Sequence, residues 1–154
     1  MHLPEASEEL REALERSVDK YNRQSFIAED PISIPHSFSK KEDIEISAFL
    51  TATISWGNRK SILVSANRLM EYMDQTPFDF VLNAQPKDFK NWKPSIHRTF
   101  MKQDVEFFVK SLRRIYVEEG GMEMLFTKGF SLGGSKEAIE YFRNIFVGNE
   151  LHRA

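Results

Sequence analysis

The segment between Glu42 and Trp56 restricts the fold most, because it is apolar on nearly every side of a helix. Its side chains fall on two faces at helical spacing: Ile46, Phe49, Leu50, Thr53 and Trp56 on the first, and the mostly small Ile44, Ala48, Ala52 and Ser55 on the second. A helix that is apolar all round is a buried helix. The small face lets a neighbouring helix pack closely. We therefore predict that this segment is the central helix of the domain, with Trp56 turned toward the core.

Capping residues mark the start of most other predicted helices. They are Ser7 before Leu10–Tyr21, Ser39 with Glu42 as an S-x-x-E capping box for the central helix, Asn58 before Ile62–Met73, Thr76 before Pro77, and Ser135 before the last helix. A further helix is expected around residues 105–115. Pro31 and Pro35 exclude a helix from the segment around them, because proline lacks the backbone N–H.

These segments amount to about seven helices and no strand. The sequence thus predicts an all-α fold, a compact multi-helix domain covering residues 1–154. The last predicted helix is followed only by the short stretch GNELHRA. We therefore expect the chain to be the N-terminal portion of a longer protein.

Composition excludes several kinds of site. The chain has no cysteine, which rules out disulfides, thiolate metal sites and a cysteine nucleophile. No run approaches the roughly 18 apolar residues of a membrane helix, and the polar N-terminus is no signal peptide, so we predict a cytoplasmic protein without a membrane partner. The net charge of −2 gives no overall attraction to nucleic acid, so DNA binding requires a local patch. No cofactor is predicted.

The histidines do not predict a metal site, because no two of them stand at metal-ligand spacing with a carboxylate. His36 lies in one irregular segment, and His97 with Arg98 lies in another. Ordered irregular segments often carry function, so these three residues are secondary candidates. The stretch GFSLGGSK is similar to a phosphate-binding loop, but it lacks the preceding strand and the lysine directly after the last glycine. We interpret it as a connection between helices.

The turn after the central helix is the main candidate site. Gly57 ends that helix, Asn58 caps the next one, and Arg59 and Lys60 occupy its first turn. Cations are disfavoured at a helix N-terminus unless an anion lies nearby. Free backbone N–H groups, the helix dipole and two cations together form a phosphate site. We predict that Trp56, Gly57, Asn58, Arg59 and Lys60 bind duplex DNA, with Asn58 better placed than Trp56 to reach a base.

Two stretches resemble the N-terminal part of a bacterial family of uncharacterised proteins. They are YNRQSFIAEDPISIPHSFSKKEDIEISAFLTATISWGNRKSI and IHRTF. Members of that family are longer, and their C-terminal half resembles the helix-hairpin-helix DNA glycosylases, with a proline-leucine-aspartate-x-histidine type of motif at the catalytic aspartate. The resemblance implies an incomplete glycosylase-like fold, whose catalytic half is absent from this chain. No catalytic residue is assigned here.

The resemblance to the glycosylases extends to the turn itself. Endonuclease III-like enzymes have a buried helix that ends in a leucine-serine-alanine-glutamine run, and the glutamine enters the DNA stack when a base is flipped out. The equivalent stretch here is ISWGN, in which Ser55 matches and either Trp56 or Asn58 replaces the glutamine. Extrusion of a base costs a few kcal/mol, which a side chain filling the gap offsets. The departure at the glutamine puts base flipping in question.

The sequence and the resemblance are compatible with three functions. The first is a DNA-binding, repair-type protein of the glycosylase superfamily. The resemblance implies that this chain lacks the catalytic half of such an enzyme. The second is a non-catalytic interaction module, because thirteen phenylalanines exceed the obvious needs of a small helical core; they would dock onto the missing half or another protein. The third is a small-molecule hydrolase that uses His36 or His97, although no nucleophile and base pair is visible.

Overall fold

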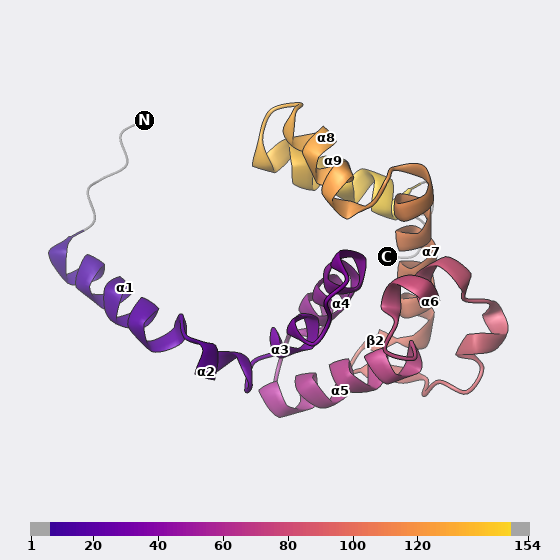
Figure 1. Cartoon of the computed structure of the whole chain (residues 1–154), viewed down its shortest axis with the longest axis horizontal. Helices are drawn as coiled ribbons and strands as arrows, with labels where there is room; N and C mark the ends of the chain where they lie inside the picture. The colour runs from indigo at the N-terminus through magenta and orange to yellow at the C-terminus, as the bar shows by residue number, and fades with distance from the viewer. Residues whose placement is uncertain (1–6, 149–154) are drawn as a thin grey trace.

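The computed structural model describes residues 7–148, and within them the chain is mostly helical. The elements in chain order are α1 (Glu8–Tyr21), α2 (Gln24–Ile27), α3 (Ser33–His36), α4 (Lys41–Ile54), α5 (Arg59–Tyr72), α6 (Pro77–Asn83), the 3₁₀ turn η1 (Pro86–Phe89), β1 (Ser95–His97), β2 (Phe100–Met101), α7 (Lys102–Glu118), α8 (Met122–Phe130) and α9 (Ser135–Val147). Figure 1 shows α4 to α9 gathered together, with α1 and α2 extending away from them. The all-α prediction is confirmed.

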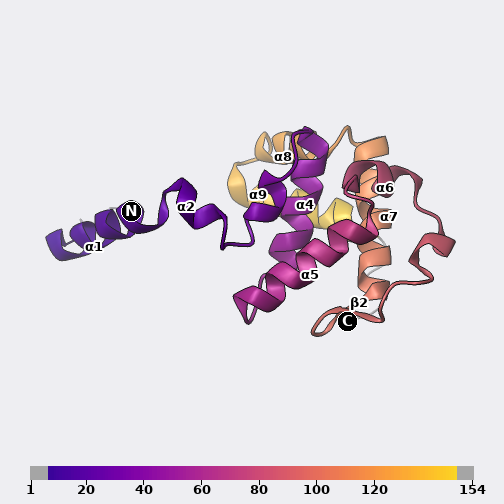
Figure 2. The ribbon, with the colours of Figure 1, turned by 60° about the horizontal axis from the view of Figure 1, so that its bottom comes forward.

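Helix α4 is the central helix of the fold, as its apolar sequence predicted. The side chains of Ile46, Leu50 and Ile54 are 0% exposed. The helix packs against α3, α5 and α6, and Figure 2 shows it in the middle of the helical body. One part of the prediction is wrong: Ala52 and Ser55 on the small face stay exposed. That face is therefore not fully covered by a neighbour.

Aromatic side chains cluster around Phe49 of α4. The ring of Phe49 lies 5.6 Å from that of Phe108, 5.5 Å from Phe142 and 5.2 Å from Phe146, measured between centroids. Of the thirteen phenylalanines, only Phe126 and Phe130 are exposed. The core therefore uses most of the phenylalanines that the sequence presented as a surplus.

A polar contact also joins α4 to α7. The Tyr116 hydroxyl donates a hydrogen bond to Glu45 Oε2 at 2.7 Å. Burial, together with that bond, raises the pKa of Tyr116 above its usual range. The hydroxyl therefore stays protonated and remains a hydrogen-bond donor at all physiological pH values.

The predicted caps are confirmed at two helices and wrong at others. Ser7 caps α1 by accepting from the backbone N–H of Leu10, and Asn58 caps α5. Helix α4 begins after Lys40 without a side-chain cap, so the Ser39 capping box does not form. Similarly, Ser135 is the first residue of α9, and Thr76 precedes α6 without a capping bond.

The segment around Pro31 and Pro35 contains a helical turn that the sequence did not predict. Helix α3 is only four residues long, and Pro35 is its third residue. The N–H groups of a first helical turn have no partner within the helix, so proline costs nothing there. A second difference is the hairpin of β1 and β2, which pair antiparallel with Ser95 opposite Met101 and His97 opposite Phe100.

Helix α1 carries its apolar side chains on an exposed face. None of its residues is buried, and Leu10, Leu14, Val18 and Tyr21 are between 49% and 56% exposed. Figures 1 and 2 both show α1 standing away from the other helices. The periodic stripe thus predicted the helix correctly but does not contribute to the core.

Across residues 7–148, no helix is both long and apolar enough to span a membrane.

Replacing Leu50 by alanine should lower the free energy of unfolding by about 2–5 kcal/mol, because it opens a cavity at a fully buried position. Urea unfolding followed by circular dichroism measures the change. Val64 is 63% exposed on α5, and its replacement by alanine is the control, with an expected change within about 0.5 kcal/mol. Equal losses in the two variants would contradict the central position of α4.

Candidate functional site

Two segments that are distant in the sequence meet at one surface of the structure. The first is the turn from Ser55 to Asn58 between α4 and α5, and the second is the β1–β2 hairpin. His97 joins them: its Nε2 lies 3.1 Å from the backbone carbonyl oxygen of Trp56, and its Nδ1 lies 3.0 Å from Ser65 Oγ on α5. The main candidate turn and the secondary candidates His97 and Arg98 are therefore parts of one cluster.

The partners of His97 determine the tautomer of its neutral ring. A carbonyl oxygen only accepts, so Nε2 carries the hydrogen and donates it to Trp56. The remaining nitrogen, Nδ1, then accepts from the hydroxyl of Ser65. His97 is 4% exposed and Ser65 is 7% exposed, so both polar groups are buried and both are satisfied. Their role in the cluster is to hold the turn, α5 and the hairpin together.

Trp56 lies on the surface of this cluster and not in the core. It is 42% exposed, its ring stands edge-on to His97 at 5.8 Å, and the Arg98 guanidinium lies 5.0 Å from its ring centroid. The prediction of a core position is wrong because α4 ends at Ile54. Beyond that residue the helical phase, which aligned Trp56 with Phe49, no longer applies.

Gly57 allows the hairpin to approach the turn. Its φ of +99° lies in a region that other residues rarely adopt. A Cβ placed on Gly57 would lie 2.4 Å from Nη2 of Arg98. Arg98 itself has a positive φ of 51°, and its carbonyl oxygen accepts a hydrogen bond from the Ser95 hydroxyl at 3.0 Å. The glycine therefore leaves the space that the guanidinium occupies beside Trp56.

The first turn of α5 retains free donors and cations. Asn58 Oδ1 accepts from the backbone N–H of Ser61 at 3.2 Å. Within the described part of the chain, the backbone N–H groups of Arg59 and Lys60 have no hydrogen-bond acceptor. Both side chains are exposed, and the Arg59 guanidinium lies 5.6 Å from the centroid of Phe26. Asn58 is thus engaged as a cap, whereas Arg59 and Lys60 are open to an anion.

A pocket of about 450 Å³ opens beside the same turn. Its walls come from the connection between α2 and α3, the last turns of α4, Gly57 and the start of α5. Thr51 lines it and is 3% exposed. The Thr51 hydroxyl is buried and has no hydrogen-bond partner among the described residues. Sequence reasoning missed Thr51, Ser65 and Asp30, because none of them belongs to a motif and no local pattern links them to the turn.

His36 is not part of the cluster. It is the last residue of α3, and its side chain is exposed. None of the hydrogen bonds that join the turn to the hairpin involves it. The two histidine candidates are therefore separate features.

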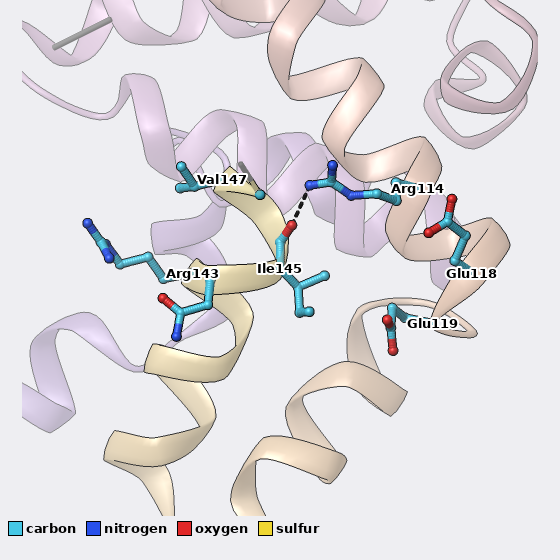
Figure 3. Close-up of a pocket in the computed structure, with 8 residues that line it drawn as sticks. Arg114, Glu118, Glu119, Arg143, Ile145 and Val147 are labelled. Carbon is cyan, nitrogen blue, oxygen red and sulfur yellow. Dashed lines mark hydrogen bonds between the residues drawn. The ribbon is translucent and has the colours of Figure 1, made fainter. Parts of the chain in front are cut away.

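A second pocket, shown in Figure 3, has a structural explanation. Arg114 reaches from α7 to the C-terminal end of α9, where it donates to the backbone carbonyl oxygens of Ile145 and Phe146. Terminal helix carbonyls lack partners within the helix, and an arginine is a suitable donor for them. Over residues 7–148, no group of three or more potential ligands is arranged to hold a metal ion.

Residues 30–154 match the family described as "protein of unknown function (DUF2400)". The chain belongs to this family. The match includes both the turn and the hairpin but begins after α1 and α2, and it confirms the resemblance to an uncharacterised family. No curated protein and no solved structure matches the chain significantly. The family match does not extend to the glycosylases.

Replacing Gly57 by alanine should lower the free energy of unfolding by about 1–3 kcal/mol, because the positive φ is strained for any side chain. It should also displace Arg98 from Trp56. The double variant Gly57→Ala/Arg98→Ala removes the clash and keeps the backbone strain. Thermal unfolding of both variants, together with quenching of Trp fluorescence by an added solute, separates the two effects, because Trp56 is 42% exposed and Trp92 only 7%. Unchanged quenching in Gly57→Ala would contradict the close approach of the hairpin.

Proposed function

We propose that this protein binds duplex DNA through the surface formed by Trp56, Arg59, Lys60 and Arg98. The observation that carries the proposal is the exposed Trp56 ring with the Arg98 guanidinium against it, beside a helix N-terminus with free N–H groups. Helix N-termini of this kind are suited to phosphate oxygens. An exposed aromatic ring beside cations is the combination that binds nucleic acids by stacking and charge.

The charge distribution supports the same surface. The chain has a net charge of −2, yet residues 55–61 and 95–101 together contain Arg59, Lys60 and Arg98 and no acidic residue. The helix dipole of α5 adds partial positive charge at Arg59 and Lys60. Phosphate contacts supply most of the affinity of a DNA-binding protein. This local excess of cations is the kind of patch that DNA binding requires in an acidic chain.

The repair-type, glycosylase-like activity is the finer part of the proposal. It is supported by the sequence resemblance of the stretch ISWGN and by the exposure of Trp56 at the end of a buried helix. Because Asn58 caps α5, Trp56 is now the better candidate for entering a gap in the base stack. The surface itself offers no exposed nucleophile and base pair, so chemistry would depend on residues outside this cluster.

Replacing Arg59, Lys60 or Arg98 by alanine should lower the affinity for duplex DNA and make that affinity less dependent on salt. Removing one phosphate interaction should reduce the magnitude of the slope of log K against log salt by about 0.9. Fluorescence anisotropy with a labelled duplex at several salt concentrations measures both quantities. Lys136→Ala and Arg143→Ala on α9 remove the same charge elsewhere and serve as controls. Equal effects at the two surfaces would contradict a localised binding site.

Trp56→Ala should reduce the preference for a duplex with an abasic or mismatched site over an intact duplex. The loss should be about 1–3 kcal/mol, the contribution of one stacked base. Trp56→Phe should retain part of the preference, because it keeps an aromatic ring. Indifference of the wild-type protein to both the lesion and the Arg59→Ala/Lys60→Ala change would overturn the repair-type proposal.

A non-catalytic interaction module is the second candidate, and α8 and α9 favour it. The exposed side chains of Phe126, Phe130, Leu132 and Ile139 are between 38% and 68% accessible, and three of them line a groove between these helices. Contiguous exposed apolar surface often marks a protein contact. Size-exclusion chromatography and dye binding compare the wild type with Phe130→Ser/Ile139→Ser. A wild type that is monomeric and binds no dye argues against this role.

The hydrolase alternative receives the least support from the geometry. Both ring nitrogens of His97 are bonded inside the protein, and His36 has no nucleophilic neighbour among its described hydrogen-bond partners. Activity that persists after both histidines are changed to alanine would dismiss this alternative.

A further inference from the structure

We propose that helix α1 binds α1 of a second copy of this chain, in an antiparallel pair with the two apolar faces together. The proposal is independent of DNA binding, because α1 belongs neither to the turn nor to the hairpin. Isolated helices shorter than about 12–15 residues are marginally stable in water, and packing of one face supplies most helical stability in proteins. Helix α1 has 14 residues, and none of them is buried. Within the described chain it therefore lacks the packing that would stabilise it.

The apolar face of α1 is continuous and uncovered. It consists of side chains at steps of three or four residues, which lie on one side of a helix: Leu10, Leu14, Val18 and Tyr21. Each of them is about half exposed. Figures 1 and 2 show α1 standing apart from the helical body. A second helix can therefore reach this face without displacing any other described element.

The charges of α1 favour an antiparallel pair. Residues 8–15 contain four acidic residues and one basic residue, whereas residues 16–23 contain three basic residues and one acidic residue. An exposed ion pair within the helix, between Glu12 and Arg16 at 3.4 Å, cancels one of these charges in each half. In an antiparallel pair, the acidic half of each helix lies beside the basic half of the other, and the two helix dipoles are opposed. A parallel pair would place like charges together.

Glu9 and Lys20 mark the two ends of this arrangement. The 11-residue step between them is about three helical turns, so both lie on the same side of α1. Each directly precedes an end of the apolar face, Leu10 or Tyr21. Both side chains are exposed, and neither forms an ion pair among the described residues. When the faces meet antiparallel, Glu9 of each copy lies beside Lys20 of the other, because a twofold contact repeats every interaction.

Other partners fit this helix less well. Helices that lie on membrane surfaces are rich in lysine and arginine on their polar face, and nucleic acids bind an excess of cations. Helix α1 instead carries five acidic and three basic residues. The apolar groove between α8 and α9 of a second copy is also open to α1. However, the lysines of those helices, Lys128 and Lys136, already form ion pairs within their own copy.

The expected dimer is weak and exchanges with the monomer. A standard interface uses about 20–30 residues from each partner, and α1 supplies 14. Dissociation removes the packing of α1, so the helix content of the chain should fall on dilution. The helix precedes residues 30–154, which match the family. The pairing is therefore a property of the segment before the family match.

The first test removes the centre of the apolar face. Sedimentation equilibrium of the whole chain at low salt measures association, and circular dichroism over the same concentrations measures helix content. Leu14→Ser should weaken the dimer by about tenfold or more, because a buried leucine is lost from each copy. Val117→Ser, at a position of α7 that is 67% exposed, is the matched control and should leave association unchanged.

The second test exchanges the charges at the ends of the pair. Glu9→Lys should weaken association by about threefold to tenfold, because it places two cations together at each end. Glu9→Lys/Lys20→Glu should restore association to within about twofold of the wild type. The exchange is unfavourable to the dipole of a single helix, so its rescue reports a contact between copies. Glu71→Lys, the same change at an exposed position of α5, is the control.

Three results would overturn the proposal. The first is a wild-type chain that stays monomeric at every concentration. The second is association that is equal in Leu14→Ser and the wild type, or that the charge exchange does not restore. The third is a dimer that is lost in Phe130→Ser/Ile139→Ser and unaffected by Glu9→Lys, which would place the contact at the groove between α8 and α9.

Discussion

The hydrogen bonds of one buried imidazole hold the candidate site together. His97 donates to the carbonyl oxygen of Trp56 and accepts from Ser65, and so links β1 to both the turn and α5. Arg68 on α5 adds a second link to β1 by donating to the carbonyl oxygen of Ile96 at 2.6 Å. The exposed contact between Arg98 and Trp56 depends on the His97 bonds, since both residues are positioned by backbone that His97 fixes. The candidate surface is therefore supported by a satisfied buried polar group, which is costly to disrupt.

The end of α4 at Ile54 produces the remaining features of the site. Above that point the helix is enclosed by aromatic rings and by α3, α5 and α6. Around this end, the small residues Ala52 and Ser55 are left uncovered, and a pocket lies beside them. The same ending turns Trp56 outward and frees the N-terminus of α5. One helix boundary thus separates the buried core from the surface on which Trp56, Arg59 and Arg98 are exposed.

Part of this site could be predicted from residue types and local rules. Gly57 and Asn58 have the breaker and cap roles expected of them, and Arg59 and Lys60 occupy the first turn as expected. The same rules failed for Trp56, because they extended the helical phase past Ile54, where α4 ends. They did not single out Thr51, because helical spacing predicts burial but not whether a hydroxyl finds a partner.

The sequence by itself determined the helical content, the burial of α4, and the glycine and asparagine turn that follows it, because these depend on periodicity and on preferences of single residues. Only the tertiary structure decided that the turn meets the hairpin 41 residues away, that Trp56 is exposed, and that a pocket lies beside them. Those outcomes depend on which elements pack together. Contacts between elements that are distant in the sequence depend on the packing of the whole core, which a local sequence pattern does not describe.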